Sequence, residues 1–371
     1  MDYLESKPLT DRIEYPAVFP AVEFTANQPG APAVVWPRSS GSRQVRIRFL
    51  NPMGPHNATL TVSSGTYTTG LGTVNLGVTA SPTVLTFPAG GEAESILTIT
   101  GMPNYVAKGT ITIPFTLIGL TGLSGAIGQV VYLTDSSPIG IQSPVWTNVL
   151  DDACVWALGL AGEDPCRGAT TNGMFFQGPF RYDPFDSSYT IDNPYLVGFT
   201  QQFRLVRFFI DREEATGALD VDCRDVSNYV GIMWRALGVS AQWIQLSSNP
   251  SGFRTHPICW IGDDPAYSYN YDPYNFNFHQ MPIDSGWNVY DAVGAHYFDL
   301  QGNAYRDLAI KWFDLNYWQT PAPGIRVYPD AVYSNYVGLT RCYSGVPEPP
   351  LGAEVQSIII FGNVIGYGED N

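Results

Sequence analysis

Short runs in which apolar and polar residues alternate fill the chain before residue 140. These runs are RQVRIRFL, ATLTVSS, TVLTF, ESILTIT, TITIPFTLIGL and QVVYLT, and glycine, proline or asparagine residues bound them. A period of two is typical of strands that bury one face, and the spacing of the turns is that of an antiparallel sandwich. The pattern predicts an all-β sandwich over residues 1–139. A module of this kind serves more often as a scaffold or docking surface than as a catalyst.

The pattern changes near residue 140. The stretch SPVWTNVLDDACVWALGLAG predicts a helix, whereas DNPYLVGFTQQFRLVRFFID has mixed periodicity and stays open between helix and strand. Strand-like runs follow, among them AQWIQL, PICWIG, FNFHQMPI and WNVYDAV. Helices first and strands after predict an α+β domain over residues 140–305. The tail, residues 306–371, contains proline-rich turns and one strong strand, VQSIIIFGNVI, and we expect an extension that packs on the second domain.

Charge and hydropathy exclude several classes of function. The chain of 371 residues has a formal net charge of −15, and only 14% of its residues are charged. It therefore lacks the basic patch that nucleic acid or an anionic membrane surface requires. No apolar stretch approaches the ~18 residues that cross a bilayer, and no apolar run follows basic residues at the start, so we expect neither a membrane span nor a signal peptide. Low charge with abundant Gly, Thr, Ser, Asn and Tyr favours an extracellular or particle-associated location.

The cysteines are not spaced as metal ligands. The chain has five, at positions 154, 166, 223, 259 and 342, and no two of them form a C-x-x-C pair. Zinc sites use such closely spaced pairs, so we expect no structural metal and no cofactor. An odd number leaves at least one thiol free in any intramolecular pairing scheme.

One of these cysteines begins a predicted helix, in DVDCRDVSNYVGIMWRALGV. Asp222 fits the N-cap, Asp225 forms a partial capping box with it, and Gly238 ends the helix. The N–H groups and the positive end of the helix dipole stabilise a thiolate at Cys223, and the same N–H groups could stabilise an oxyanion. Both aspartates oppose the thiolate. A reactive Cys223 therefore needs a cationic partner.

The stretch FNFHQMPIDSGWNVYDA predicts a β-hairpin that supplies this partner. With residues 284–286 as a three-residue loop, Ile283 lies opposite Trp287, and His279 lies opposite Asp291. Opposed side chains sit within ~5.5 Å at Cβ, so a carboxylate there holds one imidazole nitrogen and raises the basicity of the other. An ordinary structural His–Asp pair has the same pattern. The position of Cys223 and the order Cys, His, Asp along the chain favour a catalytic set.

At these residues the sequence resembles the transglutaminase-like superfamily, whose fold is related to papain-type cysteine peptidases. The shared pattern is a helix that opens with Cys223 and ends in RALGV, a strand with His279, and SGWNVYD ending at Asp291. The resemblance covers roughly residues 140–305, and DDACVWALG with TTNGMFFQGPFRYDP matches the helical region before the cysteine. It implies that Cys223 is the nucleophile, His279 the base and later acid, and Asp291 the orienting carboxylate.

The sequence departs from this family in two places. His279 is followed by Gln280 and Met281, where many members have an aromatic or aliphatic residue, and one residue type is missing upstream of the cysteine. Protein-crosslinking transglutaminases carry a tryptophan upstream of the cysteine that helps to stabilise the oxyanion. This chain has no tryptophan between Trp156 and Trp234. Tyr182, Tyr189 or Tyr195 could substitute, and the sequence does not choose among them.

The first domain resembles Calx-beta and immunoglobulin-like modules over roughly residues 60–137, in TVLTFPAGGEAESILTIT and IGQVVYLTD. Where a Calx-beta repeat carries an acidic, calcium-binding turn, this chain has GMPNYVAKG. A turn without carboxylates is a poor ligand for a hard cation, so we expect no calcium there.

The sequence as a whole predicts a transglutaminase-like cysteine enzyme that needs no cofactor. It would act on glutamine side chains or peptide amides of a protein or peptide substrate, through a thioester, with crosslinking, deamidation and proteolysis all open. The N-terminal sandwich would be free to dock a partner. The alternative is a catalytically silent structural or adhesive component of an extracellular or virion-like assembly that keeps the fold.

Overall fold

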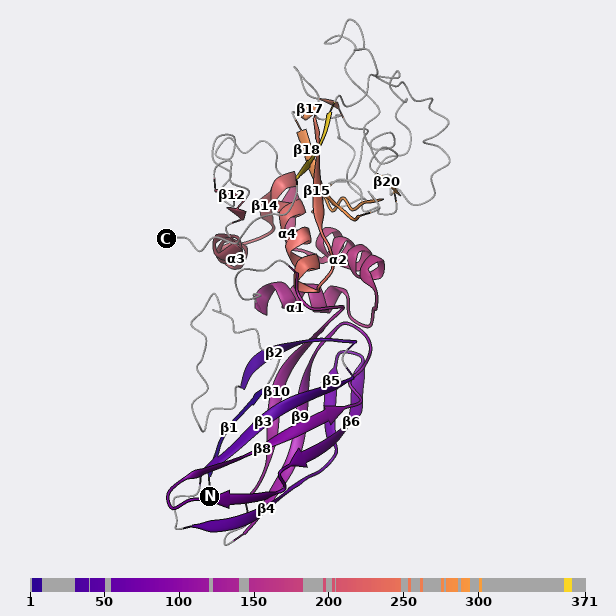
Figure 1. Cartoon of the computed structure of the whole chain (residues 1–371). Helices are drawn as coiled ribbons and strands as arrows, with labels where there is room; N and C mark the ends of the chain where they lie inside the picture. Colours follow the sequence, from indigo (N-terminus) through magenta and orange to yellow (C-terminus); the bar gives the residue numbers. More distant parts are fainter. Residues whose placement is uncertain are drawn as a thin grey trace, which may run out of the picture. The chain divides into compact units, whose positions relative to one another are not determined.

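A computed structural model of the chain shows two compact units, mostly β with few helices (Figure 1). Unit 1 comprises Met1–Cys166 and Ala236–Val239, and unit 2 comprises Arg167–Arg235 and Ser240–Asn371. The predicted domain boundaries, after residues 139 and 305, stay predictions. The residues that the structure describes are 2–8, 31–39, 41–50, 55–119, 123–139, 147–182, 196–197, 202–203, 205–247, 253–254, 261–262, 275–276, 278–285, 288–293, 300–301 and 357–361.

The strands of unit 1 include every run that the alternating pattern predicted. Those runs became β3, β4, β7, β8, β9 and β10, whereas β1, β2, β5 and β6 were not predicted. The strands are β1 Asp2–Pro8, β2 Ala31–Pro37, β3 Ser42–Leu50, β4 His56–Val62, β5 Gly65–Thr69, β6 Gly72–Ser81, β7 Val84–Phe87, β8 Glu92–Thr100, β9 Ala107–Ile118 and β10 Leu123–Thr134.

These strands form one ten-stranded sheet that curls on itself (Figure 1). The order is β1-β3-β8-β6-β5-β9-β10-β2, with β4 paired to β7 and β9. The two halves join because β6 changes partner along its length: residues 72–76 pair with β5, and residues 77–81 pair with β8. The first part of the chain is therefore β-rich, as predicted, and its two layers are halves of one sheet. One pair, β2 with β10, is parallel.

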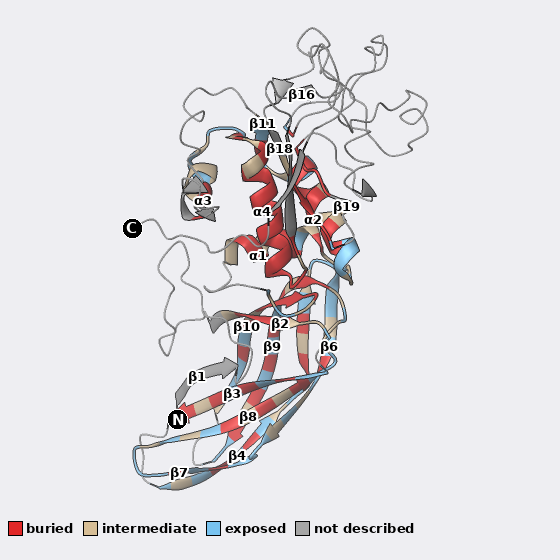
Figure 2. Cartoon of the chain, turned by 45° about the horizontal axis from the view of Figure 1, so that its top comes forward, coloured by how far each residue is buried: buried red, intermediate tan, exposed pale blue. Residues whose placement is uncertain are grey.

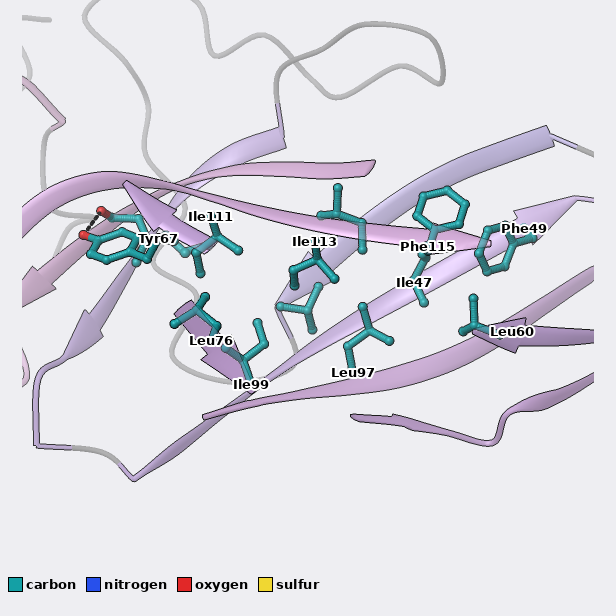
Figure 3. Close-up of a cluster of buried hydrophobic side chains, with 14 of the residues drawn as sticks. Ile47, Phe49, Leu60, Tyr67, Leu76, Leu97, Ile99, Ile111, Ile113 and Phe115 are labelled. Carbon is teal, nitrogen blue, oxygen red and sulfur yellow. Dashed lines mark hydrogen bonds between the residues drawn. The ribbon is translucent and has the colours of Figure 1, made fainter. Parts of the chain in front are cut away.

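Apolar side chains from both halves of the sheet meet in one core (Figure 3). Ile47 and Phe49 of β3 lie in the same cluster as Ile113 and Phe115 of β9, and the two phenylalanine rings meet edge to face at 5.4 Å. Because side chains alternate along a strand, each run places every second residue in this core. Full burial of an aliphatic or aromatic side chain is worth about 1.5–3 kcal/mol, so this cluster is the main source of stability in unit 1.

Helix α1, Thr147–Trp156, belongs to unit 1 and packs beside β9 and β10. Val149 and Ala153, which lie four residues apart and so share one face of the helix, are buried. On the polar side, Asp151 accepts a hydrogen bond from the Tyr132 hydroxyl and pairs with the Lys108 Nζ at 2.6 Å. The helix is therefore fixed to the sheet by apolar and charged contacts together.

The elements of unit 2 alternate between helices and short strands in the first part and are mainly strands later. They are α2 Glu163–Gln177, which begins in unit 1, β11 Phe180–Tyr182, β12 Leu196–Val197, β13 Gln202–Phe203, α3 Leu205–Glu214, β14 Leu219–Val221, α4 Cys223–Ala236, β15 Gln242–Ser247, β16 Phe253–Arg254, β17 Asn275–Phe276, β18 Phe278–Ile283, β19 Asn288–Val289, β20 Leu300–Gln301 and β21 Ser357–Phe361. The stretch of mixed periodicity, residues 192–211, contains β12, β13 and most of α3.

Five of these strands form a sheet in the order β20-β19-β18-β15-β21. Strand β21 comes from the predicted C-terminal extension and pairs antiparallel with β15, with Trp243 opposite Phe361. The remainder of residues 306–371 lies outside the described residues.

Helix α4 is buried along most of its length (Figure 2). The Trp234 Nε1 donates a hydrogen bond to the Thr170 Oγ1 of α2 at 3.0 Å, and the Trp234 ring meets that of Tyr290 at 4.9 Å. In the middle of the helix, the Tyr229 ring lies 4.8 Å from that of Phe208 on α3 and 6.4 Å from that of Phe180 on β11. These contacts hold the middle and the last turn of α4 in a defined position.

Candidate active site

The first turn of α4 is closed by a complete capping box. Helix α4 begins at Cys223, as the sequence predicted. The Asp222 Oδ1 accepts hydrogen bonds from the backbone N–H groups of Arg224 (2.7 Å) and Asp225 (3.0 Å). In return, the Asp225 Oδ2 accepts one from the backbone N–H of Asp222 at 2.9 Å. Gly238 follows the helix with a φ of +77°, the left-handed conformation that suits glycine at a helix end.

Cys223 is a free thiol with 4% of its surface exposed. A guanidinium lies next to it in sequence: the Arg224 Nε and Nη2 donate to the Asp222 Oδ2 at 3.2 and 3.0 Å. Burial lowers the pKa of Arg224, but the charge and hydrogen bond of Asp222, with Cys223 and Asp225, raise it above its ordinary value. Positive charge is therefore present beside the thiol, and it is ion-paired with the N-cap aspartate.

Tyr182 lies next to this turn because β11 pairs in parallel with β14. Tyr182 is in register with Val221, two residues before Cys223. The pKa of Tyr182 is raised well above its ordinary value, first by burial, although the residue keeps some exposed surface, and then by the negative charges of Cys223, Asp222, Asp291 and Asp225. Coulomb interactions weaken with distance, so the charges of Cys223 and Asp291 that act on the tyrosine hydroxyl place the three groups in one neighbourhood.

Main-chain hydrogen bonds connect the segments that carry Tyr182 and Asp291. The Tyr182 N–H donates to the Ile261 carbonyl at 3.0 Å, and the Ile261 N–H donates to the Val293 carbonyl at 2.8 Å. Asp291 is fully buried, and its Oδ1 accepts a hydrogen bond from the Val293 N–H at 2.8 Å. The structure thus assembles this site from β11, the start of α4 and residues 291–293.

The hairpin that carries His279 and Asp291 has a different register from the predicted one. Ile283 pairs with Val289 instead of Trp287, and the Tyr290 N–H donates to the Pro282 carbonyl at 3.0 Å. The predicted register was therefore wrong by two residues.

The reason for the difference is the side chain of Asp284. Its Oδ1 accepts a hydrogen bond from the Asn288 N–H at 2.9 Å, and its Oδ2 accepts one from the Asn288 Nδ2 at 2.8 Å. These bonds close a loop longer than three residues. A shift of two residues keeps every side chain on its face, because the pleat repeats every two residues. Continued along both strands, the observed register places Asp291 opposite Met281. His279 then becomes a diagonal neighbour of Asp291 on the same face.

His279 lies on β18, where its backbone is in register with Leu246 of β15. Its side chain is outside the described residues, as are Tyr189 and Tyr195. The structure therefore brings Cys223, Asp291 and Tyr182 into one neighbourhood, and the contact of the imidazole with the thiol or the carboxylate stays a prediction. Among the three tyrosines that the sequence left open, Tyr182 is the one described beside the cysteine.

An open groove of about 510 Å³ lies at the turn between α3 and β14. The Arg181 guanidinium forms a two-pronged ion pair with Asp220 on its wall, at 2.8 and 3.0 Å. Because side chains alternate across a strand, Arg181 and Asp220 face the other side of the β11–β14 pair from Tyr182. The groove is lined by Arg181, Asp211, Glu214, Ala215, Thr216, Gly217, Ala218, Leu219 and Asp220.

In the part of the chain that the structure describes, no group of three or more His, Cys, Asp or Glu side chains is placed to hold a metal ion. No helix in these described segments combines the length and the apolar character that a bilayer crossing requires.

No protein-family model and no curated protein matches this chain. Among solved structures, a family 123 glycoside hydrolase from Clostridium perfringens covers 27% of this chain and 22% of its own, at 12% identity and a TM-score of 0.20. The E. coli chaperone DraB covers 28% and 52%, at 14% identity and 0.20. Red sea bream transglutaminase covers 75% and 48%, at 8% identity and 0.38. This chain therefore spans about half or less of these proteins, and scores this low assign it no family.

Proposed function

We propose that this chain is a transglutaminase-like cysteine enzyme in which Cys223, His279 and Asp291 act together. The observation that carries the proposal is the shared neighbourhood of Cys223 and Asp291 around Tyr182, since three distant segments supply these groups. A fully buried carboxylate is a costly feature for a purely structural core. The convergence of Cys223 and Asp291 at the residues of the family pattern favours chemistry.

The proposed reaction is acyl transfer through a thioester. His279 takes the proton of the Cys223 thiol, and the thiolate attacks the carbonyl carbon of a glutamine side chain or peptide bond. The carbon–nitrogen bond breaks as His279 returns the proton to the departing ammonia or amine. Water or a primary amine then attacks the thioester, gives its proton to His279, and releases Cys223 as a thiol. No cofactor takes part.

Asp291 would hold His279 from a diagonal position. Diagonal neighbours on one face lie about 7–8 Å apart in the backbone, which long side chains can bridge. The Val293 N–H fixes one carboxylate oxygen of Asp291 at 2.8 Å, so the side chain is already oriented. An imidazole bound to this carboxylate presents its other nitrogen as a base.

The test is alkylation of the full-length protein with iodoacetamide at pH 7, with mass spectrometry to identify the modified cysteines. We expect Cys223 to react at least about tenfold faster than Cys154 and Cys166, because only a thiolate is a good nucleophile. The advantage should be lost in His279→Ala and kept in His56→Ala, a histidine of unit 1. Ammonia release from a glutamine peptide, with and without a primary amine, then separates transfer from hydrolysis. Equal labelling of all three cysteines contradicts the proposal.

The 4% exposure of Cys223 favours a second candidate, a silent structural or adhesive component that keeps the fold. A thiol that the substrate cannot reach cannot catalyse the reaction. This candidate predicts slow labelling of Cys223 that His279→Ala does not change, so the same experiment decides between the two functions.

A further inference from the structure

The capping box of α4 leaves few donors for the oxyanion that attack on a carbonyl produces. The Asp222 carboxylate engages the N–H groups of Arg224 and Asp225, and the Asp222 carbonyl accepts from the Val226 N–H at 3.2 Å. The first-turn N–H group that Asp222 does not engage is that of Cys223 itself. From the sequence alone, all of these N–H groups could have stabilised the oxyanion. In the folded chain the aspartate already uses most of them.

A second donor has to come from a neighbouring segment, and it has to be compatible with its surroundings. Asp222 and Asp225 flank Cys223 in the sequence, and their negative charges, together with that of Asp291, act on the Tyr182 hydroxyl. An oxyanion formed at Cys223 is stabilised only by groups that donate a hydrogen bond without adding negative charge. A neutral hydroxyl meets this requirement.

We infer that the Tyr182 hydroxyl is the second donor to the oxyanion, working with the backbone N–H of Cys223. This inference rests on the proposed function and names a catalytic residue for it. Strand β11 holds Tyr182 in register with Val221, and the hydrogen bond from its N–H to the Ile261 carbonyl fixes the strand from the other side. Tyr182 is thus held at the level of the helix start by bonds on both edges.

The protonation state of Tyr182 suits this role. Burial and the charges of Cys223, Asp222, Asp291 and Asp225 raise its pKa well above the ordinary value. The hydroxyl therefore keeps its proton at every pH at which a thiolate and a neutral imidazole coexist. It can donate throughout the reaction and needs no change of its own charge.

The test compares two reactions of Cys223 in wild type and Tyr182→Phe. Acylation by 4-nitrophenyl acetate passes through a tetrahedral oxyanion, whereas alkylation by iodoacetamide displaces iodide at a saturated carbon and forms none. We expect Tyr182→Phe to lower the acylation rate about 100-fold, the usual effect of removing one such donor, with the alkylation rate within about twofold of wild type. Tyr229→Phe, a buried tyrosine in the aromatic cluster of α4, is the matched control and should change neither rate.

The other outcomes separate a failure of the inference about Tyr182 from a failure of the proposed function. If Tyr182→Phe lowers both rates equally, Tyr182 acts on the ionisation of the Cys223 thiol and not on the oxyanion, and the inference is overturned. An unchanged acylation rate overturns it as well. The number of alkylated cysteines checks folding, because an unfolded variant exposes all five. If wild type is acylated no faster than Cys223→Ala, the proposed function fails and the inference fails with it. If wild type is acylated and Tyr182→Phe is acylated at the same rate, the inference fails while the proposed function still stands.

Discussion

Cys154 and Cys223 are both buried free thiols on helices, yet their surroundings differ. Cys154 lies near the end of α1 with no exposed surface, and its Sγ is 4.0 Å from the Leu133 carbonyl. Its pKa is raised by burial first, then by Asp151 and Cys166, with Lys108 opposing. Cys223 opens α4, precedes Arg224 in the sequence, and carries a charge that acts on the Tyr182 hydroxyl. The comparison teaches that position on the helix and polar neighbours, more than burial, distinguish a candidate nucleophile from a packing residue.

The largest expected difference between the two cysteines is in catalysis. Cys223→Ala should abolish thioester formation and lower transfer by about 10⁴-fold or more, because the nucleophile is gone. Cys154→Ala should leave the rate within about twofold and lower the free energy of unfolding by about 1–2 kcal/mol, through lost packing. Single-turnover kinetics and urea unfolding measure the two effects. Full activity in Cys223→Ala would remove the basis of the comparison.

The two buried carboxylates of the hairpin extend the comparison. Asp291→Asn should lower the rate of acyl transfer by about 10²–10⁴-fold, because an uncharged amide orients the imidazole poorly and does not stabilise its protonated form. Asp284→Asn is the matched control: its side chain closes the loop to Asn288, so we expect a loss of stability with the rate nearly unchanged. Transfer kinetics and thermal unfolding of both variants test this. Equal effects on the rate would contradict a special role for Asp291.

Alkaline pH should lower the free energy of unfolding, and we expect Cys154 to be one cause. Its pKa is raised from 9.0, so the folded state holds the thiol proton more tightly than the unfolded state does. Stability from this group is complete below pH 9 and falls by about 1.4 kcal/mol per pH unit above it. Tyr67, which is also buried in unit 1 with a raised pKa, acts in the same direction from its ordinary value of 10.0. Unfolding between pH 7 and 10.5 should therefore be less pH-dependent in Cys154→Ala than in wild type. Identical slopes would exclude Cys154 as a cause.

The smallest expected effect concerns the cap itself. Asp222→Ala removes the acceptor for two N–H groups and should lower the free energy of unfolding by about 1 kcal/mol. Asp220→Ala removes an exposed ion pair with Arg181 and should cost about 0.5 kcal/mol or less. Urea unfolding of the two variants gives the difference. A larger loss in Asp220→Ala than in Asp222→Ala would contradict the expectation that the cap stabilises the fold more than the exposed ion pair does.

Local patterns predicted much of this molecule. Helix α4 begins at Cys223 and is followed by Gly238 as expected, because N-caps, apolar periodicity and left-handed glycine act over only a few residues. The strands with strict alternation were found for the same reason. Strand β6 was missed: of its residues only Leu76 is buried, so its pattern in sequence is weak.

The hairpin shows where local reasoning fails. A loop of Asp284, Ser285 and Gly286 is chemically reasonable, but the Asp284 side chain bonds to Asn288 and closes a longer loop. A side chain that replaces a backbone partner in this way leaves no periodic trace in the sequence. The two-residue shift kept each side chain of the hairpin on its face of the sheet and changed the residue that it lies opposite.

What the sequence determined by itself is the chemistry available at the start of α4: a cysteine, its capping aspartates and the helix that follows. Those are set by hydrogen bonds within one turn. Tertiary structure alone decided that Tyr182 lies near that thiol, because β11, Ile261 and residues 291–293 meet through bonds between segments far apart in the chain. Such bonds depend on how the whole unit packs, and no short stretch of residues contains that information.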